Sequence, residues 1–437
     1  MGRIRGSVLL VATFVVALIV AACTPPPTGP GTSTTTSTTS TTSSTSTTST
    51  TSTTSTTSTT TTTSTTSTTT TTTTIPEDPD PEVVSVSAGR SHSCAVLADG
   101  TAACWGRNLF GQLGDGSTTS STTPVAVSGL TGVVAIDAGS FHSCALLVDG
   151  TLRCWGSNQS GQLGNGQSGF LANSAVPVAV TGLPAVRSLD IAGDHSCALL
   201  TDGTVRCWGY ASAGQLGNGS DDSSAVPVPV SDLSGVTALA IGQQHSCAVA
   251  TGGTVKCWGF NSSGQTGNYA TSWPVWTPKL VTGLAPAVAV SVGVVHSCAL
   301  LADATVSCWG VSSNGALGAG SVNLALEPLA VPGLGGVTAI ESGGSQTCAH
   351  LADATVRCWG DNTYGELALG NGAPTAVRVP AEVDAFAGTT RLDTGEDHTC
   401  AVTAAAAVVC VGRNQYGQLG DGTTNDAATP VAVDWSV

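Results

Sequence analysis

Seven pairs of cysteines recur along this chain, and the two members of every pair are ten positions apart. The unit repeats roughly every 50 residues, a period typical of architectures in which neighbouring units bury each other's faces. Of the 15 cysteines only Cys23 stands outside the pairs, and so many paired cysteines favour an oxidising compartment. The pairs are Cys94 with Cys104, Cys144 with Cys154, Cys197 with Cys207, Cys247 with Cys257, Cys298 with Cys308, Cys348 with Cys358, and Cys400 with Cys410.

The spacing within a pair predicts a β-hairpin. If Cys94 lies opposite Cys104, then Ala98-Asp99-Gly100 forms a three-residue loop, which favours a type I turn followed by a left-handed residue. Glycine adopts that conformation without steric cost, and it stands at this position in the first four units. Opposed residues in an antiparallel pair are within disulfide range, so we expect seven disulfides, each inside its own hairpin. A zinc site would need four thiolates gathered together, so no metal is expected.

Each unit contains four short strand-like segments and no amphipathic helix. The unit from Val133 to Leu183 shows this pattern most clearly, with an apolar strand, a cysteine hairpin, a glycine-rich stretch and a last strand. Seven such units predict an all-β, seven-bladed β-propeller. The expected propeller covers residues 83–437, with repeats at roughly 83–132, 133–185, 186–235, 236–287, 288–336, 337–385 and 386–437.

A second set of recurring residues surrounds the cysteines. The first unit carries His92, Asp99-Gly100, Trp105-Gly106 and Gly111-Gln112-Leu113-Gly114, and the others repeat most of these. This pattern resembles the repeats of the regulator of chromosome condensation family, whose fold is a seven-bladed propeller. The resemblance implies structural roles for two sets of residues, namely His92, His142, His195, His245, His296 and His398, and Trp105, Trp155, Trp208, Trp258, Trp309 and Trp359.

The later units depart from the pattern. Alanine replaces the turn glycine at Ala304 and Ala354, Gln346 stands where a histidine is expected, and Val411 replaces a tryptophan. Alanine is disfavoured in the left-handed conformation, so these hairpin tips should be less stable.

The N-terminus resembles a bacterial lipoprotein signal peptide over residues 1–22. Two arginines precede an apolar run from Val8 to Val20, and small residues then lead to Cys23, the expected lipidation site. The run is short for a membrane span. An ordinary secretory signal cleaved near Ala22 is the alternative. The expected location is the bacterial cell envelope or surface, with a lipid anchor as the only membrane attachment.

Residues 23–82 form an expected disordered linker. The stretch from Thr32 to Thr74 contains only threonine and serine, and a proline-rich acidic segment follows it. Such a composition offers no apolar residues for a core. We expect a spacer that holds the folded head away from a membrane or wall.

Charge argues against a nucleic-acid partner, because the net charge is −15 with only 13 basic residues. Four basic residues share one repeat position, and four acidic residues recur on the first strand. We expect interstrand ion pairs, or stacking on tryptophan, to explain both sets. They are Arg153, Arg206, Lys256 and Arg357, and Asp137, Asp190, Glu341 and Asp393.

The chain has no phosphate-binding motif and no set of catalytic residues that breaks the repeat, so we expect neither a cofactor nor an enzyme. The informative residues are those that differ between units. Tyr269, Trp273 and Trp276 lie in a connection where other units carry serine and threonine, and Phe170 lies in an insertion. Large aromatic residues there suit interface anchors, although a local mini-core is an equal alternative.

These features predict a surface-anchored, non-enzymatic head, monomeric by itself, that binds a protein partner. A bacterial relative of this fold inhibits β-lactamases through one propeller face, so inhibition of an extracellular enzyme is one variant. The family's namesake activity, nucleotide exchange on a small GTPase, is an alternative. A secreted enzyme that acts on the cell wall is another.

Overall fold

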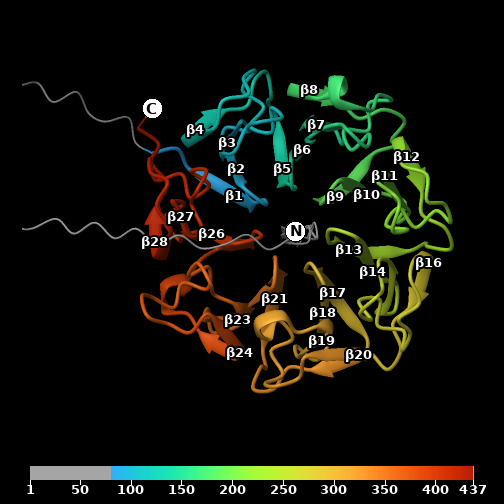
Figure 1. Ribbon diagram of the computed structural model, residues 1–437. Helices are drawn as coiled ribbons and strands as arrows, with labels where there is room; N and C mark the ends of the chain where they lie inside the picture. Colours follow the sequence, from blue (N-terminus) through green and yellow to red (C-terminus); the bar gives the residue numbers. More distant parts are fainter. Residues whose placement is uncertain (1–79, 437) are drawn as a thin grey trace, which may run out of the picture. The chain divides into compact units, whose positions relative to one another are not determined.

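The computed structural model describes residues 80–436, which form seven four-stranded antiparallel sheets arranged as blades around an axis (Figure 1). The predicted fold class is confirmed. The predicted signal peptide, Cys23 and the linker up to residue 79 lie outside the described residues. Within the described part of the chain, no helix is long and apolar enough to span a membrane.

The blades follow one another along the chain, and each uses four consecutive strands. The strands of blades 1 to 4 are β1 (Val83–Ala88), β2 (His92–Leu97), β3 (Ala102–Gly106), β4 (Ser121–Ala126), β5 (Val133–Ala138), β6 (His142–Leu147), β7 (Leu152–Gly156), β8 (Ser174–Ala179), β9 (Val186–Ala192), β10 (His195–Leu200), β11 (Val205–Gly209), β12 (Ser224–Pro229), β13 (Val236–Ile241), β14 (His245–Ala250), β15 (Thr254–Gly259) and β16 (Val275–Leu280). Those of blades 5 to 7 are β17 (Ala287–Val292), β18 (His296–Leu301), β19 (Val306–Val311), β20 (Leu324–Ala330), β21 (Val337–Ser342), β22 (Gln346–Leu351), β23 (Val356–Asp361), β24 (Ala376–Glu382), β25 (Arg391–Thr394), β26 (His398–Val402), β27 (Val408–Gly412) and β28 (Ala427–Ala432).

Three one-turn 3-10 helices interrupt the otherwise all-strand pattern. They are η1 (Phe170–Ala172), η2 (Ser313–Gly315) and η3 (Asp384–Phe386). The expectation of no helix holds for α-helices in the described residues, because every helix there is a single turn. Blade 5 begins one residue before its predicted start, at Ala287, and the first strand of blade 7 begins at Arg391, after η3.

The central hairpin of every blade has the predicted register. Cys94 lies opposite Cys104, Leu97 N–H donates to the Thr101 carbonyl at 3.0 Å, and Gly100 is left-handed with a φ of 80°. The turn prediction is therefore confirmed in blade 1, and the same cysteine register recurs in the other six hairpins.

All seven predicted disulfides are present, each within its own hairpin. Their Cα–Cα distances are 4.0 to 4.1 Å, shorter than the usual Cα separation of about 4.5–5.5 Å between opposed residues. The bonded pairs are Cys94 with Cys104, Cys144 with Cys154, Cys197 with Cys207, Cys247 with Cys257, Cys298 with Cys308, Cys348 with Cys358, and Cys400 with Cys410.

The buried tryptophans join adjacent blades. The indole N–H of Trp155 donates to the carbonyl of Gln112 in the preceding blade at 2.9 Å, and its ring packs in an apolar cluster with residues of blade 1. The other five recurring tryptophans make the same type of bond. Blade 7 carries the buried Val411 instead, so the junction between blades 6 and 7 lacks this bond.

The ring closes by direct contact between blades 7 and 1. Blade 1 is built only from the first four strands, and blade 7 only from the last four strands, of the described chain. Trp105 donates to the Gln418 carbonyl at 2.9 Å, as at other junctions. Trp435 then packs edge-on against Trp105, with ring centroids 6.0 Å apart. Closure therefore needs no exchange of strands between the first and last units.

The acidic residues on the first strands have a role that the sequence analysis did not predict. Asp137 accepts the Ile191 N–H at 2.6 Å, Asp190 accepts the Ile241 N–H at 3.1 Å, and Asp393 accepts the Ala88 N–H at 2.7 Å. The expectation of ion pairs with the basic stripe is wrong for these three, because each buried carboxylate bonds to the backbone of the next blade. Burial raises the pKa of all three, and for Asp393 to about 6.

The basic stripe has partners of its own. Lys256 donates to the Asp232 carbonyl at 2.8 Å, and Arg357 forms an ion pair with Glu382 at 3.4 Å across β23 and β24. The predicted interstrand ion pair is therefore present for Arg357, but with a residue of the fourth strand. Neither of these two contacts involves a buried first-strand carboxylate.

We expect glycine at Ala354 to stabilise the protein. Ala354 is left-handed, with a φ of 67°, at the turn position that Gly150 fills in blade 2. Relief of this strain is partly offset by the greater freedom of glycine in the unfolded chain. Ala354→Gly should therefore raise the free energy of unfolding by about 0.5–1 kcal/mol in denaturant titrations. Gly150→Ala is the matched control and should lower it by a similar amount; a lower stability of Ala354→Gly would contradict this account.

Candidate protein-binding face

One face of the propeller is built from two kinds of loop in every blade. The loops that join the first strand to the second, and the third to the fourth, leave the sheet at the same end, and we call this side the loop face. Two residues meet there in each blade, because the backbone N–H that follows the third-strand glycine donates to the carbonyl just before the second strand. These seven rim pairs are Arg107 with Ser91, Ser157 with Phe141, Tyr210 with Asp194, Phe260 with Gln244, Val311 with Val295, Asp361 with Ser345, and Arg413 with Asp397.

The rim pairs differ between blades, whereas the residues beneath them repeat. In blades 2 to 5 they include aromatic or aliphatic residues that are at least partly exposed, namely Phe141, Tyr210, Phe260 and Val311. Asp194 in blade 3 is the one charged residue among these four pairs. In blades 6, 7 and 1 they carry Asp361, Arg413, Asp397 and Arg107. The loop face therefore has an apolar arc on one side and a charged arc on the other.

Two of the aromatic residues singled out in the sequence extend the apolar arc. Trp273 is 55% exposed and packs edge-on against Phe260 with ring centroids 5.8 Å apart. Tyr269 is equally exposed, and the Asn261 amide holds the loop between them by donating to the Ala270 carbonyl at 2.8 Å. More than half of each side chain stays exposed, which favours the interface interpretation over a mini-core for both.

Phe170 and Trp276 differ from each other. Phe170 lies in η1, is 73% exposed, and no residue of that helix is buried. Trp276 lies on β16 and is half-buried against the glycine-rich loop of blade 3, where a Cβ on Gly214 would come within 3.1 Å of its ring. We therefore leave Trp276 out of the proposed binding surface, because its ring already supports a neighbouring blade.

The charged arc combines ion pairs with stacked rings. The Arg413 guanidinium donates to Asp397 at 2.8 Å and lies 4.9 Å from the centre of the Tyr364 ring. Arg90 lies 2.9 Å from the buried Glu396 carboxylate. The Glu396 oxygen lacks a well-directed hydrogen bond, and burial raises the pKa of Glu396 to about 8, so we count this as a close electrostatic contact rather than a full ion pair.

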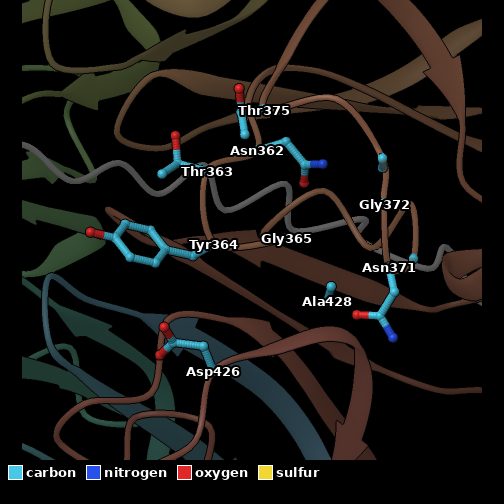
Figure 2. Close-up of a pocket in the computed structure, with 11 residues that line it drawn as sticks. Asn362, Thr363, Tyr364, Gly365, Asn371, Gly372, Thr375, Asp426 and Ala428 are labelled. Carbon is cyan, nitrogen blue, oxygen red and sulfur yellow. The ribbon is translucent and has the colours of Figure 1, made fainter.

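A polar groove of about 280 Å³ lies beside the charged arc, between the loops of blades 6 and 7 (Figure 2). Tyr364 and Asn362 line one part of it, and Asp426 lies across from them. Asn362 donates to the Pro374 carbonyl and accepts from Leu367 N–H, while Asp426 accepts from Asn414 N–H at 2.7 Å. These groups are committed to loop structure, so the groove offers no free catalytic constellation.

The recurring histidines hold blades together. His92 Nε2 lies 2.8 Å from Ser143 Oγ, and that hydroxyl donates its single proton to the Gln112 carbonyl. His92 must therefore donate from Nε2, which leaves Nδ1 as an unprotonated acceptor. Gln346 replaces the histidine in blade 6 and donates to the Gly395 carbonyl at 2.9 Å.

Burial lowers the pKa of these histidines, because desolvation disfavours the charged ring. The pKa falls to about 3 for His92, His142, His195, His245 and His398, and to about 4 for His296. Glu366, at the position of the repeat glutamine, has a pKa raised to about 8 by burial, so at neutral pH it is mainly a neutral carboxyl group that can replace an amide. Residues 80–436 contain no cluster of histidine, cysteine, aspartate or glutamate suited to a metal ion.

Sequence reasoning missed how the rim residues pair, and with this pairing it missed Arg107 and Phe141. The signal was present: Arg107 and Arg413 follow equivalent glycines, although Val411 obscures the match in blade 7. It also missed Asn108, Asn158, Asn362 and Asn414, whose side chains each accept a backbone N–H and so shape the loops beneath the face.

Two family models match the chain, and both describe the regulator of chromosome condensation (RCC1) repeat. One matches residues 83–112, 133–162, 186–215, 236–265 and 390–418, and the other matches residues 99–146, 149–199, 202–249 and 252–300. Neither matches residues 301–389, where the repeat departs most from its pattern. No curated protein matches the chain.

Solved structures with the same fold include yeast RCC1 (Prp20). In a crystal with Kap60 it is 20% identical, with 79% of this chain and 83% of that chain covered and a TM-score of 0.67. Prp20p from Saccharomyces cerevisiae, in a second structure, is 20% identical, with 78% and 87% covered and a TM-score of 0.69. Human WBSCR16 is 22% identical, with 82% and 83% covered and a TM-score of 0.56. At these identities the likeness is one of fold.

We expect His142→Gln to lose less stability than the wild type as the pH falls. The unfolded histidine titrates near its ordinary pKa of 6.5 and the buried one near 3, so its contribution is present above pH 6.5 and lost as pH falls toward 3. Glutamine does not titrate, so the variant lacks this pH-dependent contribution to the free energy of unfolding. Between pH 6.5 and 4.5 its free energy of unfolding should fall by about 2.5 kcal/mol less than that of the wild type.

Denaturant titrations at several pH values measure this difference. Val148→Ala, at an exposed residue on the opposite face, should keep the wild-type pH dependence. Equal acid slopes for His142→Gln and wild type would show that His142 takes up a proton within the fold.

Proposed function

Because this chain belongs to the regulator of chromosome condensation (RCC1) repeat family, we propose that its propeller is a protein-binding head that works without catalysis. RCC1-type propellers serve as protein-interaction scaffolds, and the yeast relative was crystallised bound to Kap60 and examined for binding to Gsp1p and histones. For this chain, we place the partner on the loop face.

The observation that carries the proposal is the apolar arc. Phe170, Tyr210, Tyr269 and Trp273 are between 37% and 73% exposed, and all come from loops that join the third strand to the fourth in blades 2 to 4. Exposed aromatic residues gathered on one side of a soluble domain are typical of protein interfaces, where they act as anchors. The glycine-rich scaffold beneath holds them on fixed loops, which limits the entropy lost on binding.

The proposed setting is outside the cell. Seven disulfides suit an oxidising compartment, and an anchor at Cys23 followed by the threonine- and serine-rich linker would hold the head away from the membrane. This setting disfavours nucleotide exchange on a cytosolic GTPase. An inhibitor of an extracellular enzyme would fit the same face.

Removal of the Trp273 side chain should weaken partner binding. The head is used to capture partners from the surface of the native cell, and the affinity of each is compared between wild type and Trp273→Ala. A central aromatic anchor contributes about 2 kcal/mol, so the dissociation constant should rise roughly thirtyfold.

Val148→Ala serves as the control, because Val148 is 78% exposed on the hairpin tip of the opposite face. It should leave capture unchanged. Equal loss in both variants, or none in Trp273→Ala, would remove the apolar arc as the interface. Acceleration of nucleotide release from a small GTPase by the purified chain would instead support the exchange alternative.

Loss of the thiol at Cys23 should release the protein from the membrane. In a bacterial host grown with labelled palmitate, wild type should carry the label and sediment with membranes. Cys23→Ser should carry no label and appear in the soluble exported fraction. Unlabelled wild-type protein that is nevertheless exported would favour the ordinary secretory signal.

A further inference from the structure

Blades 7 and 1 carry an arginine at the same rim position. Arg413 N–H donates to the Asp397 carbonyl at 2.8 Å, and Arg107 N–H donates to the Ser91 carbonyl at 2.9 Å. Each guanidinium also lies over a tyrosine of the preceding blade, Arg413 over Tyr364 and Arg107 over Tyr416, at 4.9 Å from the ring centre in both cases. The two sites are therefore equivalent in backbone and in stacking.

They differ in the counter-charge. In blade 7 the Asp397 carboxylate accepts from Arg413 at 2.8 Å. In blade 1 the equivalent residue is Ser91, which cannot supply a charge, and the Arg107 side chain has no hydrogen-bond or ion-pair partner among residues 80–436. The site at Arg107 therefore has the arginine and the stacked tyrosine but no carboxylate.

A second ring replaces that carboxylate as a support. The Arg107 guanidinium lies 5.3 Å from the centre of the Phe141 ring, on the neighbouring blade, and Phe110 packs edge-on against Phe141 at 5.4 Å. The guanidinium is thus stacked against Tyr416 and Phe141, with its Nε buried. Such stacking fixes its orientation while the terminal nitrogens keep their donors available.

Two further buried polar groups belong to the same junction. The Gln112 amide nitrogen and the Ser140 hydroxyl, both at most 2% exposed, have no hydrogen-bond partner among the described residues. The equivalent amides of Gln215 and Gln265 are unpartnered as well, so this feature is not confined to the junction at Arg107. The amide of Gln162 donates to the Asp194 carboxylate at 3.1 Å. The repeat therefore shows twice, at Asp397 and at Asp194, that these positions accept a carboxylate.

We propose that Arg107, held by Tyr416 and Phe141, is a docking point for an aspartate or glutamate side chain of the protein partner. The proposal rests on the protein-binding function, and it adds a charged contact to the apolar arc. Arg90 nearby is already in close contact with Glu396, so within the described residues Arg107 is the cation of this cluster that remains for a ligand. A forked guanidinium binds a carboxylate through two parallel hydrogen bonds.

The site lies on an open face, which favours a carboxylate presented by a protein. A free small carboxylate would lose translational freedom for one ion pair in contact with water, and such pairs contribute little, so a free carboxylate should bind only at high concentration. A side chain carried by a docked partner avoids that separate loss. The partner expected here presents an acidic residue to Arg107 in blade 1 and an apolar patch to Tyr210 and Trp273 on the other side of the loop face.

The test is a titration of the full chain labelled with [15N]arginine, followed through the Nε–Hε resonances of the arginine side chains. The probe is glutamate capped at both ends as N-acetyl-glutamate N-methylamide, at constant ionic strength. The Arg107 resonance, assigned by its loss in Arg107→Lys, should shift and saturate. The Arg413 resonance should not move, because Asp397 already occupies that guanidinium.

Ser91→Asp is the decisive variant, because it restores the residue type that blade 7 carries at this position. The new carboxylate should pair with Arg107, shift its resonance without any probe, and raise the dissociation constant of capped glutamate by about tenfold or more. The backbone of blade 7 shows that this position accepts an aspartate. Unchanged resonances of the other arginines would confirm that the fold is intact.

Capped glutamine is the matched probe without charge and should cause no shift. A shift of Arg107 that is equal for capped glutamine, or equal for inorganic phosphate, would overturn a carboxylate-specific site. Undiminished binding of capped glutamate to Ser91→Asp would overturn it as well. None of these measurements needs the partner, so failure here is separate from failure of the Trp273 test.

Discussion

One backbone carbonyl per blade junction holds the propeller together. The carbonyl of Gln112 accepts the Ser143 hydroxyl and the Trp155 indole of the next blade, both at 2.9 Å, while His92 donates to the same serine. All of these groups are buried, and a buried donor or acceptor left without its partner costs more than the bond contributes. The glycine-rich loop that carries the glutamine must therefore occupy one position relative to the next blade. The backbone of the rim residues is fixed together with that loop.

This rigid base explains why the rim pairs can vary. In every blade the same N–H to carbonyl bond joins the two rim residues, whatever their side chains are. The backbone specifies where a side chain begins, and the sequence decides its chemistry. An apolar arc over blades 2 to 5 and a charged arc over blades 6, 7 and 1 are thus two uses of one geometry. The comparison of Arg107 with Arg413 depends on this equivalence.

Local features of the fold were predictable. The disulfides and the three-residue turns follow from spacings of ten residues or fewer, within which the register of a hairpin is set by its turn. The role of the acidic first-strand residues was not predictable in the same way. Asp137 accepts from the Ile191 N–H and Asp393 from the Ala88 N–H. These partners are backbone groups of another blade, and a pattern of side chains in the sequence cannot identify a backbone partner.

The sequence by itself determined a seven-bladed repeat scaffold, its hairpin register and disulfide pairing, and the blades in which the pattern breaks. Only the tertiary structure decided which of the residues that depart from the repeat lie close to one another. Phe141 and Tyr416 are 34 and 309 positions from Arg107 in the chain, yet both rings stack on its guanidinium. Closure of the ring brings blade 7 beside blade 1, so an arginine that looks isolated in the sequence acquires its neighbours from both sides.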